Sequence, residues 1–283
     1  MEKRQLKNFV NNSEVLYSYL KEKAVNHPCY KYYSSLDRIE QNFMRTQSLF
    51  LSMGSKWNDR SDFERFNDDQ LSIARFGMCF SYSKSESVPM WMLYGGLKHT
   101  GAMIDFPPKM MKSIVNDTEK VYLGYFKDGE YKECGNYQSN EFNIFIQDVL
   151  YFGDSSKEKN MGTYYVKRSD ETVDGVSMNV IGDNRIIKKR IGWSYENETR
   201  LIVEINKEII NNSDGIGTNS ANTSLIIKIP FDNIQDISLS DKIVLAPNYN
   251  GCSRDYRKSN LTRELEWDLC DSCCFRTAEK IEP

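Results

Sequence analysis

Two glutamates separated by one residue, Glu196 and Glu198, lie in the segment GWSYENETRLIV. The stretch from Trp193 to Ile205 is predicted to be a strand, whose alternation would place Glu196, Glu198 and Arg200 on one face. Their Cα atoms would be about 6.5–7 Å apart, which suits two carboxylates acting on neighbouring atoms of one substrate. Arg200 would lower the pKa of Glu198 and keep it charged. A solvent-facing polar strand is the alternative interpretation.

Aromatic side chains are frequent, at 12% of the chain, so surfaces that stack against a planar ligand are easily built. Tyr30, Lys31 and Tyr32 belong to a short predicted strand rich in tyrosine. Trp91 and Tyr94 are three residues apart in a short predicted helix and therefore share one of its faces. Core packing is the alternative role for this second pair.

Metal-binding patterns are weak in this sequence. Cys270 to Cys274 contain a C-x-x-C pair, but no second pair repeats its spacing, and we expect a reduced thiol cluster rather than a zinc site. Asn58, Asp59 and Glu64 could be arranged as a metal-dependent nuclease site, although their spacing is not diagnostic. No metal is therefore expected.

The overall composition is that of a globular protein of 283 residues, with 40% hydrophobic and 27% charged residues. The net charge of −3 argues against nucleic-acid binding by the whole surface. The N-terminus has no apolar signal segment, and no run approaches the ~20 apolar residues of a membrane helix. Reduced cysteines, a cytoplasmic location and no membrane association are expected.

Helical and strand-like patterns alternate irregularly, which predicts one α+β domain over residues 1–283. The expected architecture is a pair of split, curved mixed β-sheets with surrounding helices. An N-terminal helical segment spans residues 1–26, and a polar stretch, residues 153–183, is expected to be a long loop or lid. Helices are predicted near residues 62–76 and 141–152, and a terminal helix at 259–270. Strands are predicted at residues 29–33, 48–52, 77–82, 99–106, 121–126, 224–230 and 242–246.

Several segments, taken in order, resemble the bacterial domain-of-unknown-function family DUF2971. They are YKYYSS, LFLS, WNDRSDFE, CFSYSKSESVPMWMLYGGLKHTGAMIDF, GWSYENETRLIV and KIVLAP. Each is weak alone, but together they cover most of the chain from about Tyr30 onward.

This arrangement is similar to the ADP-ribosyltransferase superfamily, in which an E-x-E pair lies on a late strand. The resemblance implies that NAD is the substrate and that Glu198 is the catalytic carboxylate, while Glu196 orients or activates the acceptor. Tyr30 to Tyr32 would lie beside the nicotinamide mononucleotide half of NAD, and Ser52 would end the second strand.

The implied activity is an NAD-consuming ADP-ribosyltransferase or NAD glycohydrolase, acting as a bacterial toxin or anti-phage defence effector. Its acceptor is a protein, a nucleic acid or a small molecule, and a regulatory partner protein is one candidate for its activating signal. Two alternatives stay open: a non-enzymatic module that binds a nucleotide or peptide, and the metal-dependent nuclease.

Overall fold

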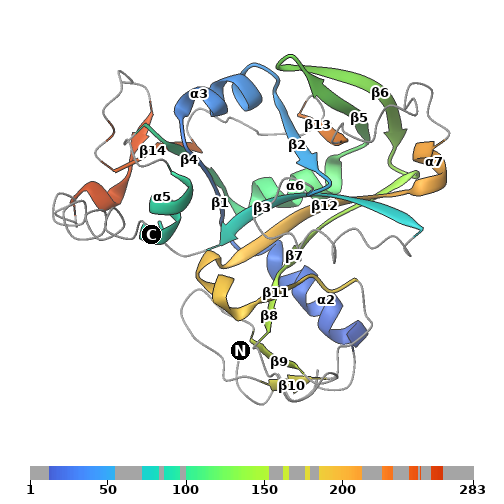
Figure 1. Cartoon of the computed structure of the whole chain (residues 1–283), viewed down its shortest axis with the longest axis horizontal. Helices are drawn as coiled ribbons and strands as arrows, with labels where there is room; N and C mark the ends of the chain where they lie inside the picture. Colours follow the sequence, from blue (N-terminus) through green and yellow to red (C-terminus); the bar gives the residue numbers. More distant parts are fainter. Residues whose placement is uncertain are drawn as a thin grey trace, which may run out of the picture.

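Eleven strands form one large mixed sheet, which is the frame of the computed structural model (Figure 1). They are β1 (Cys29–Tyr33), β2 (Ser48–Ser52), β3 (Ile73–Tyr82), β4 (Ala102–Phe106), β5 (Lys120–Lys127), β6 (Glu130–Gln138), β7 (Phe142–Asp148), β12 (Glu198–Asn206), β13 (Ile226–Pro230), β14 (Ile243–Leu245) and β15 (Arg257–Lys258). Their order is β15-β14-β4-β1-β3-β2-β13-β5-β6, and β12 pairs with β3 and β7. The structure describes residues 13–54, 72–82, 86–95, 100–152, 162–165, 176–178, 185–211, 225–231, 242–247, 249 and 256–263.

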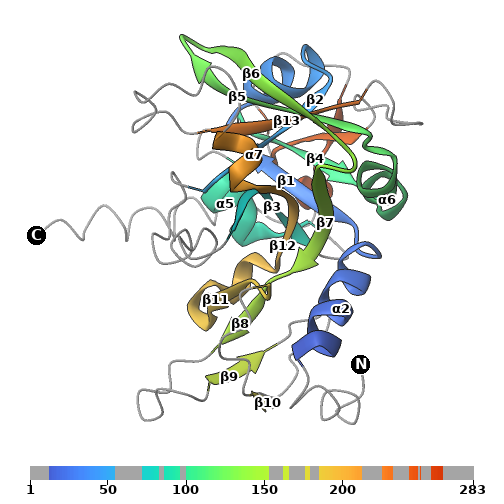
Figure 2. The same ribbon diagram turned by 90° about the vertical axis from the view of Figure 1, so that its right-hand side faces the viewer.

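A second, smaller sheet has the order β10-β9-β8-β11. Its strands are β8 (Leu150–Phe152), β9 (Gly162–Tyr165), β10 (Val176–Met178) and β11 (Lys188–Arg190). Both views place this sheet at the end of the molecule away from β5 and β6 (Figures 1 and 2). Since β11 leads directly into the turn before β12, the small sheet delivers residues to the start of that strand.

Helices surround the two sheets. They are α2 (Ser13–Ala24), α3 (Leu36–Ile39), α5 (Val88–Tyr94), α6 (Pro108–Asp117) and α7 (Lys207–Asn211), with a π-helical turn η2 (Glu40–Met44) and the 3-10 helices η3 (Ile191–Glu196) and η6 (Asn260–Arg263). Figure 2 shows α2 beside β7. The predicted α+β class is confirmed, as is the helix within the N-terminal segment, whose first 12 residues lie outside the described part.

One face of the large sheet carries the main hydrophobic core. In β12, Leu201 and Val203 point into this core, whereas Arg200 and Ile202 alternate to the opposite face. Helix α6 contributes Met110, Met111 and Ile114 to the same core. The alternation of β12 therefore turns its charged residues, Glu198, Arg200 and Glu204, away from the core, toward the face that carries the candidate site.

The strand predicted from Trp193 to Ile205 is wrong at its beginning. Trp193, Tyr195 and Glu196 belong to η3, and the strand starts only at Glu198. Between the helical turn and the strand, Asn197 has a φ of 42°. This left-handed conformation, which asparagine tolerates better than most residues, interrupts the alternation. Glu196 and Glu198 therefore come from two different elements.

Two predicted helices are also wrong where the structure describes them. Residues 142–148 form β7 and 150–152 form β8, while residues 73–76 belong to β3. In β7, Phe145 and Ile146 are both buried although they are consecutive, because the strand packs on its two faces. Such a run has no strict alternation, so its periodicity does not separate strand from helix.

The predicted loop or lid at residues 153–183 contains the strands β9 and β10. Its other residues lie outside the described part, as do residues 264–283, which include the rest of the predicted terminal helix and the Cys270–Cys274 cluster. Among the described residues, no helix has the length and apolar character required to cross a bilayer.

Replacing Leu201 by alanine tests the core assignment. Because Leu201 is 0% exposed, Leu201→Ala is expected to lower the free energy of unfolding by about 2–5 kcal/mol. Leu93 is 57% exposed, so Leu93→Ala is expected to change it by less than about 0.5 kcal/mol. Urea denaturation measures both, and equal unfolding midpoints for the two variants would show that β12 does not face the core.

Candidate active site

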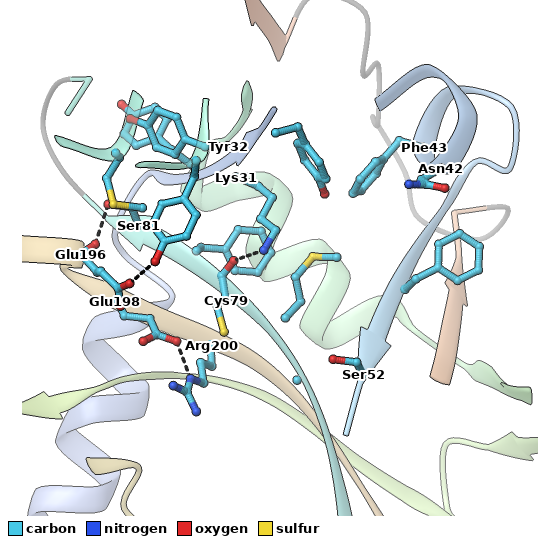
Figure 3. Close-up of a pocket in the computed structure, with 18 of the residues that line it drawn as sticks. Lys31, Tyr32, Asn42, Phe43, Ser52, Cys79, Ser81, Glu196, Glu198 and Arg200 are labelled. Carbon is cyan, nitrogen blue, oxygen red and sulfur yellow. Dashed lines mark hydrogen bonds and ion pairs between the residues drawn. The ribbon is translucent and has the colours of Figure 1, made fainter. Parts of the chain in front are cut away.

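A cavity of about 410 Å³ lies where β1 and β3 separate. Among the residues that line it are Tyr30, Lys31, Tyr32, Tyr33, Asn42, Phe43, Phe50, Ser52, Gly77, Met78, Cys79, Phe80, Ser81, Tyr94, Phe126, Lys189, Trp193, Glu196, Glu198 and Arg200. In Figure 3, Glu196, Glu198 and Arg200 lie on one side of this cavity, and Asn42, Phe43 and Ser52 lie on the other. The cavity therefore has a charged end and an aromatic end.

Strand separation explains why a cavity exists inside a sheet. Within the described residues, β1 pairs with β3 only at Cys29 and Tyr30, and β2 pairs with it only at Gly77. Residues 78–80 of β3 thus pair with neither strand along this edge. Consecutive residues 77–81 all line the cavity, which a strand allows only where its backbone edge faces the space. Lys31 Nζ crosses the gap and donates a hydrogen bond to the Cys79 carbonyl oxygen, 2.9 Å away.

Glu198 is the most enclosed acidic group of the site, at 3% exposure. Its Oε1 accepts from Arg200 Nε at 2.6 Å, and its Oε2 accepts from Lys189 Nζ at 3.0 Å. Burial alone would raise the pKa of Glu198, but the two cations outweigh burial and hold this pKa well below its ordinary value. Glu198 is therefore an ionised carboxylate at neutral pH.

Glu196 shares a cation with Glu198 but has the opposite electrostatic balance. Its Oε2 accepts from Lys189 Nζ at 2.5 Å, and its Oε1 accepts from the Tyr94 hydroxyl at 2.5 Å. Burial, together with the negative charge of Glu198, raises the pKa of Glu196 above its ordinary value. One carboxylate is thus held ionised while its neighbour binds a proton more readily, a pairing typical of acid–base sites.

Three hydrogen bonds fix the turn between the two glutamates. The Ser81 hydroxyl donates to the Glu196 carbonyl oxygen at 2.7 Å, and the Tyr82 backbone N–H donates to the Asn197 carbonyl oxygen at 2.8 Å. The Glu198 backbone N–H donates to the Tyr151 hydroxyl oxygen at 2.8 Å. These contacts from β3 and β8 hold η3 against the start of β12, so both carboxylates reach Lys189.

Most of the residues predicted from the sequence meet in this cavity. Tyr30, Lys31, Tyr32, Ser52, Tyr94, Glu196, Glu198 and Arg200 all line it. Trp91 does not line it: this side chain is buried in a hydrophobic cluster, where it packs edge-on against Tyr32 and donates to Glu86 at 2.9 Å. Asn58 and Asp59 lie outside the described residues.

Lys189 is the main site residue that the sequence did not identify. It belongs to none of the motifs that the sequence analysis singled out, yet it is 7% exposed and binds both glutamates. Its ammonium also lies 4.8 Å from the centre of the Trp193 ring. Burial lowers the pKa of Lys189, but both glutamates outweigh burial and raise it. No local sequence signal marked it, because the burial of both glutamates and the pairing of β11 with β8 are tertiary features.

The side chains of the site are bonded to one another. In the described part of the chain, no group of three or more His, Cys, Asp or Glu side chains could hold a metal ion. The two site glutamates are already occupied by Lys189, Arg200 and Tyr94. The chemistry available to this site is therefore that of an ionised carboxylate, a carboxyl group of raised pKa and aromatic rings.

Residues 90–201 match the model of a family described as a protein of unknown function, DUF2971. This match supports the family resemblance carried by the sequence motifs, and the description names no activity. The matched segment begins in α5 and ends in β12, so it contains Tyr94, Lys189, Glu196 and Glu198 but neither β1 nor β2. Searches of curated proteins and of solved structures gave no significant match.

Replacing Glu198 by glutamine is expected to destabilise the fold in a pH-dependent way. The folded-state pKa of Glu198 is depressed, so its ionised form stabilises the fold above the ordinary glutamate value of 4.5, and this contribution is lost as the pH falls through the folded value. At neutral pH, Glu198→Gln leaves two buried cations undercompensated and should cost about 3–5 kcal/mol. Urea unfolding of both proteins between pH 3 and 7 measures the difference.

The exposed Glu133→Gln serves as the matched control and is expected to change the free energy of unfolding by less than about 0.5 kcal/mol. A difference between wild type and Glu198→Gln that stays constant down to pH 3 would contradict the proposed state of Glu198.

Proposed function

We propose that this protein binds NAD in the cavity and breaks the bond between nicotinamide and ribose. The ADP-ribosyl group then passes to an acceptor or to water, so the protein is an ADP-ribosyltransferase or an NAD glycohydrolase. The observation that carries this proposal is the placement of an ionised buried carboxylate, Glu198, in one cavity with Tyr30, Lys31 and Ser52. The role of a bacterial toxin or phage-defence effector belongs to the same proposal.

Glu198 suits the cleavage step. When the glycosidic bond breaks, its electron pair leaves with neutral nicotinamide, and positive charge develops on the ribose. A fixed carboxylate in a water-poor site stabilises such charge, and it needs no reorganisation when the charge appears. Arg200 and Lys189 reduce the negative field of Glu198, but they also hold its two oxygens in place.

The edge of β3 that has no strand partner in the described part of the chain suits the nicotinamide ring, although Lys31 already occupies the Cys79 carbonyl oxygen on this edge. A carboxamide offers one acceptor and two donor hydrogens, the same groups that a neighbouring strand would offer. Residues 78–80 of β3 lack a strand partner on this side among the described residues. Tyr30, Tyr94 and Trp193 provide aromatic surface around the same space.

Glu196 suits the transfer step. An acceptor hydroxyl that attacks the ribose carbon must lose its proton, and Glu196 can take it because its raised pKa makes its carboxylate the more basic of the two. Tyr94 and Lys189 each hold one oxygen of Glu196, which orients the carboxylate toward the cavity.

A second candidate is a module that binds a nucleotide without cleaving it. This alternative is favoured by one observation: both carboxylate oxygens of Glu196 and of Glu198 already have partners within the site. A binding site uses such a network to keep its shape, whereas a catalyst must rearrange part of it. The nuclease alternative rests on Asn58, Asp59 and Glu64, which lie outside the described residues.

Incubation with NAD separates these candidates. The wild-type protein is expected to release free nicotinamide, measured by chromatography, with and without protein, nucleic-acid and small-molecule acceptors. Glu198→Gln removes the charge that stabilises the ribose cation and should slow the release by roughly 10²–10³-fold.

Glu204→Gln is the matched control. Glu204 lies on the same face of β12 and pairs with Arg75 at 2.8 Å, but it does not line the cavity, so nicotinamide release should be unchanged. Binding of NAD without any release would favour the non-enzymatic module, and neither binding nor release would end the NAD proposal. Metal-dependent cleavage of RNA or DNA would favour the nuclease.

The pH dependence of transfer should report Glu196. Its raised pKa places the acid limb of the rate profile above pH 4.5, with activity rising as Glu196 loses its proton. Glu196→Gln is expected to remove this limb and to slow transfer by about 10²–10⁴-fold. Initial rates between pH 4 and 8 measure both effects, and an unchanged acid limb in the variant would assign the base to another residue.

A further inference from the structure

Three aromatic rings form a cluster at the end of the cavity away from the glutamates. Phe50 of β2, Phe126 of β5 and Tyr131 of β6 lie with ring centres 5.1 Å (Phe50–Phe126), 5.5 Å (Phe50–Tyr131) and 5.9 Å (Phe126–Tyr131) apart. Phe50 and Phe126 also line the cavity that holds Glu198. This aromatic cluster and the candidate active site are therefore parts of one continuous space.

Register and alternation place the cluster on the face of the sheet away from the main core. In β2, Leu49 and Leu51 are buried in that core, and Phe50 alternates to the other face with Ser52. Phe50 pairs with Lys228 of β13, which in turn pairs with Tyr122 of β5. A row of aromatic and basic side chains thus continues from the cavity across three neighbouring strands.

The cluster is held rigidly although it is partly open to solvent. The Tyr131 ring packs so closely over Gly124 that a Cβ there would lie 2.6 Å from the ring carbon. The Tyr131 hydroxyl donates to the Tyr122 carbonyl oxygen at 2.8 Å. Phe126 nevertheless remains 39% exposed, one of the few large apolar side chains in the described part to be so. A fixed, exposed ring beside a cavity is a surface on which a planar group can stack.

Positive charge adjoins these rings. Lys228 Nζ lies 5.9 Å from the centre of the Tyr131 ring and 5.7 Å from that of Tyr122, and Lys120 Nζ lies 4.8 Å from the Tyr122 ring. Aromatic rings with neighbouring lysines are the combination by which proteins hold a base and its phosphate. The charge therefore complements a nucleotide better than a neutral aromatic compound.

We propose that the aromatic cluster of Phe50, Phe126 and Tyr131 is the subsite for the adenylate half of the dinucleotide. Adenine stacks on Phe126 and Phe50, and Lys228 faces the neighbouring phosphate. Phe50 lies two strands from Glu198, and because β2 and β3 are paired only at Gly77 within the described residues, the two side chains are at least roughly 10 Å apart across the sheet. One extended dinucleotide can therefore place its reacting ribose at Glu198 and its second base on the cluster. This inference rests on the proposed function for its choice of ligand.

Binding of AMP and of nicotinamide mononucleotide, measured by titration calorimetry, tests the subsite. Phe126→Ala should weaken AMP binding by about 5- to 150-fold, the range expected for one stacked base. Phe126→Leu keeps apolar volume without the ring and should weaken it in the same direction. Nicotinamide mononucleotide carries no adenine, so its affinity should be the same in all three proteins. Leu93→Ala, at an exposed position outside the cavity, is the control and should bind both ligands as wild type does.

Equal AMP affinity in wild type and both Phe126 variants would overturn the subsite, as would a parallel loss of nicotinamide mononucleotide binding. Nicotinamide release without any AMP binding would also overturn it and leave the catalytic proposal standing. AMP binding through Phe126 without nicotinamide release would support the subsite and remove the catalytic proposal. If a short single-stranded oligodeoxyadenylate binds through Phe126 and AMP does not, the ligand of the aromatic cluster is a nucleic acid, and the adenylate subsite is overturned.

Discussion

Four buried charges that must neutralise one another determine the candidate site. Glu196, Glu198, Lys189 and Arg200 are each at most 7% exposed. Removing any one of them from the set leaves a charge without its partner in a medium that solvates it poorly, which is far more costly than losing a surface ion pair. The positions of the surrounding elements follow from this requirement, because η3, β11 and β12 must bring their charged side chains to the same place.

The backbone satisfies this requirement beside residues 78–80 of β3, where, among the described residues, neither β1 nor β2 pairs with it. β12 pairs with β3 along nearly its whole length, whereas β1 and β2 share the other edge and leave a gap between them among the described residues. Charged side chains on β12 and an unpaired strand edge on β3 therefore border the same space. Without that gap the four charges would be buried against a continuous sheet, and no ligand could reach them.

Local sequence patterns were sufficient for part of this arrangement. The strand of Tyr30 to Tyr32, the strand ending at Ser52, and the shared face of Glu198 and Arg200 follow from alternation over a few residues. The origin of Glu196 was missed, because one residue with positive φ, Asn197, ends the helical turn and breaks the alternation. Tertiary features were also hidden: residues 145–148 of β7 are buried on both faces of the strand, and the polar edge strand β6 carries no apolar alternation. The role of Lys189 depends on a parallel pairing between β11 and β8 that joins residues 38 positions apart, as for Lys188 and Leu150.

The shared cation of Glu196 and Glu198 has a consequence for the proposed reaction as a whole. With both glutamates ionised, the four-charge set is neutral, and NAD brings one further positive charge on its nicotinamide ring. When the bond breaks, this positive charge moves to the ribose. When the acceptor attacks, the ribose becomes neutral, and the positive charge leaves the acceptor as the proton that Glu196 takes up. The depressed pKa of Glu198 and the raised pKa of Glu196 mean that only Glu196 takes this proton. The site then contains the same total charge from bound substrate to product, and no step requires additional water to solvate a new ion.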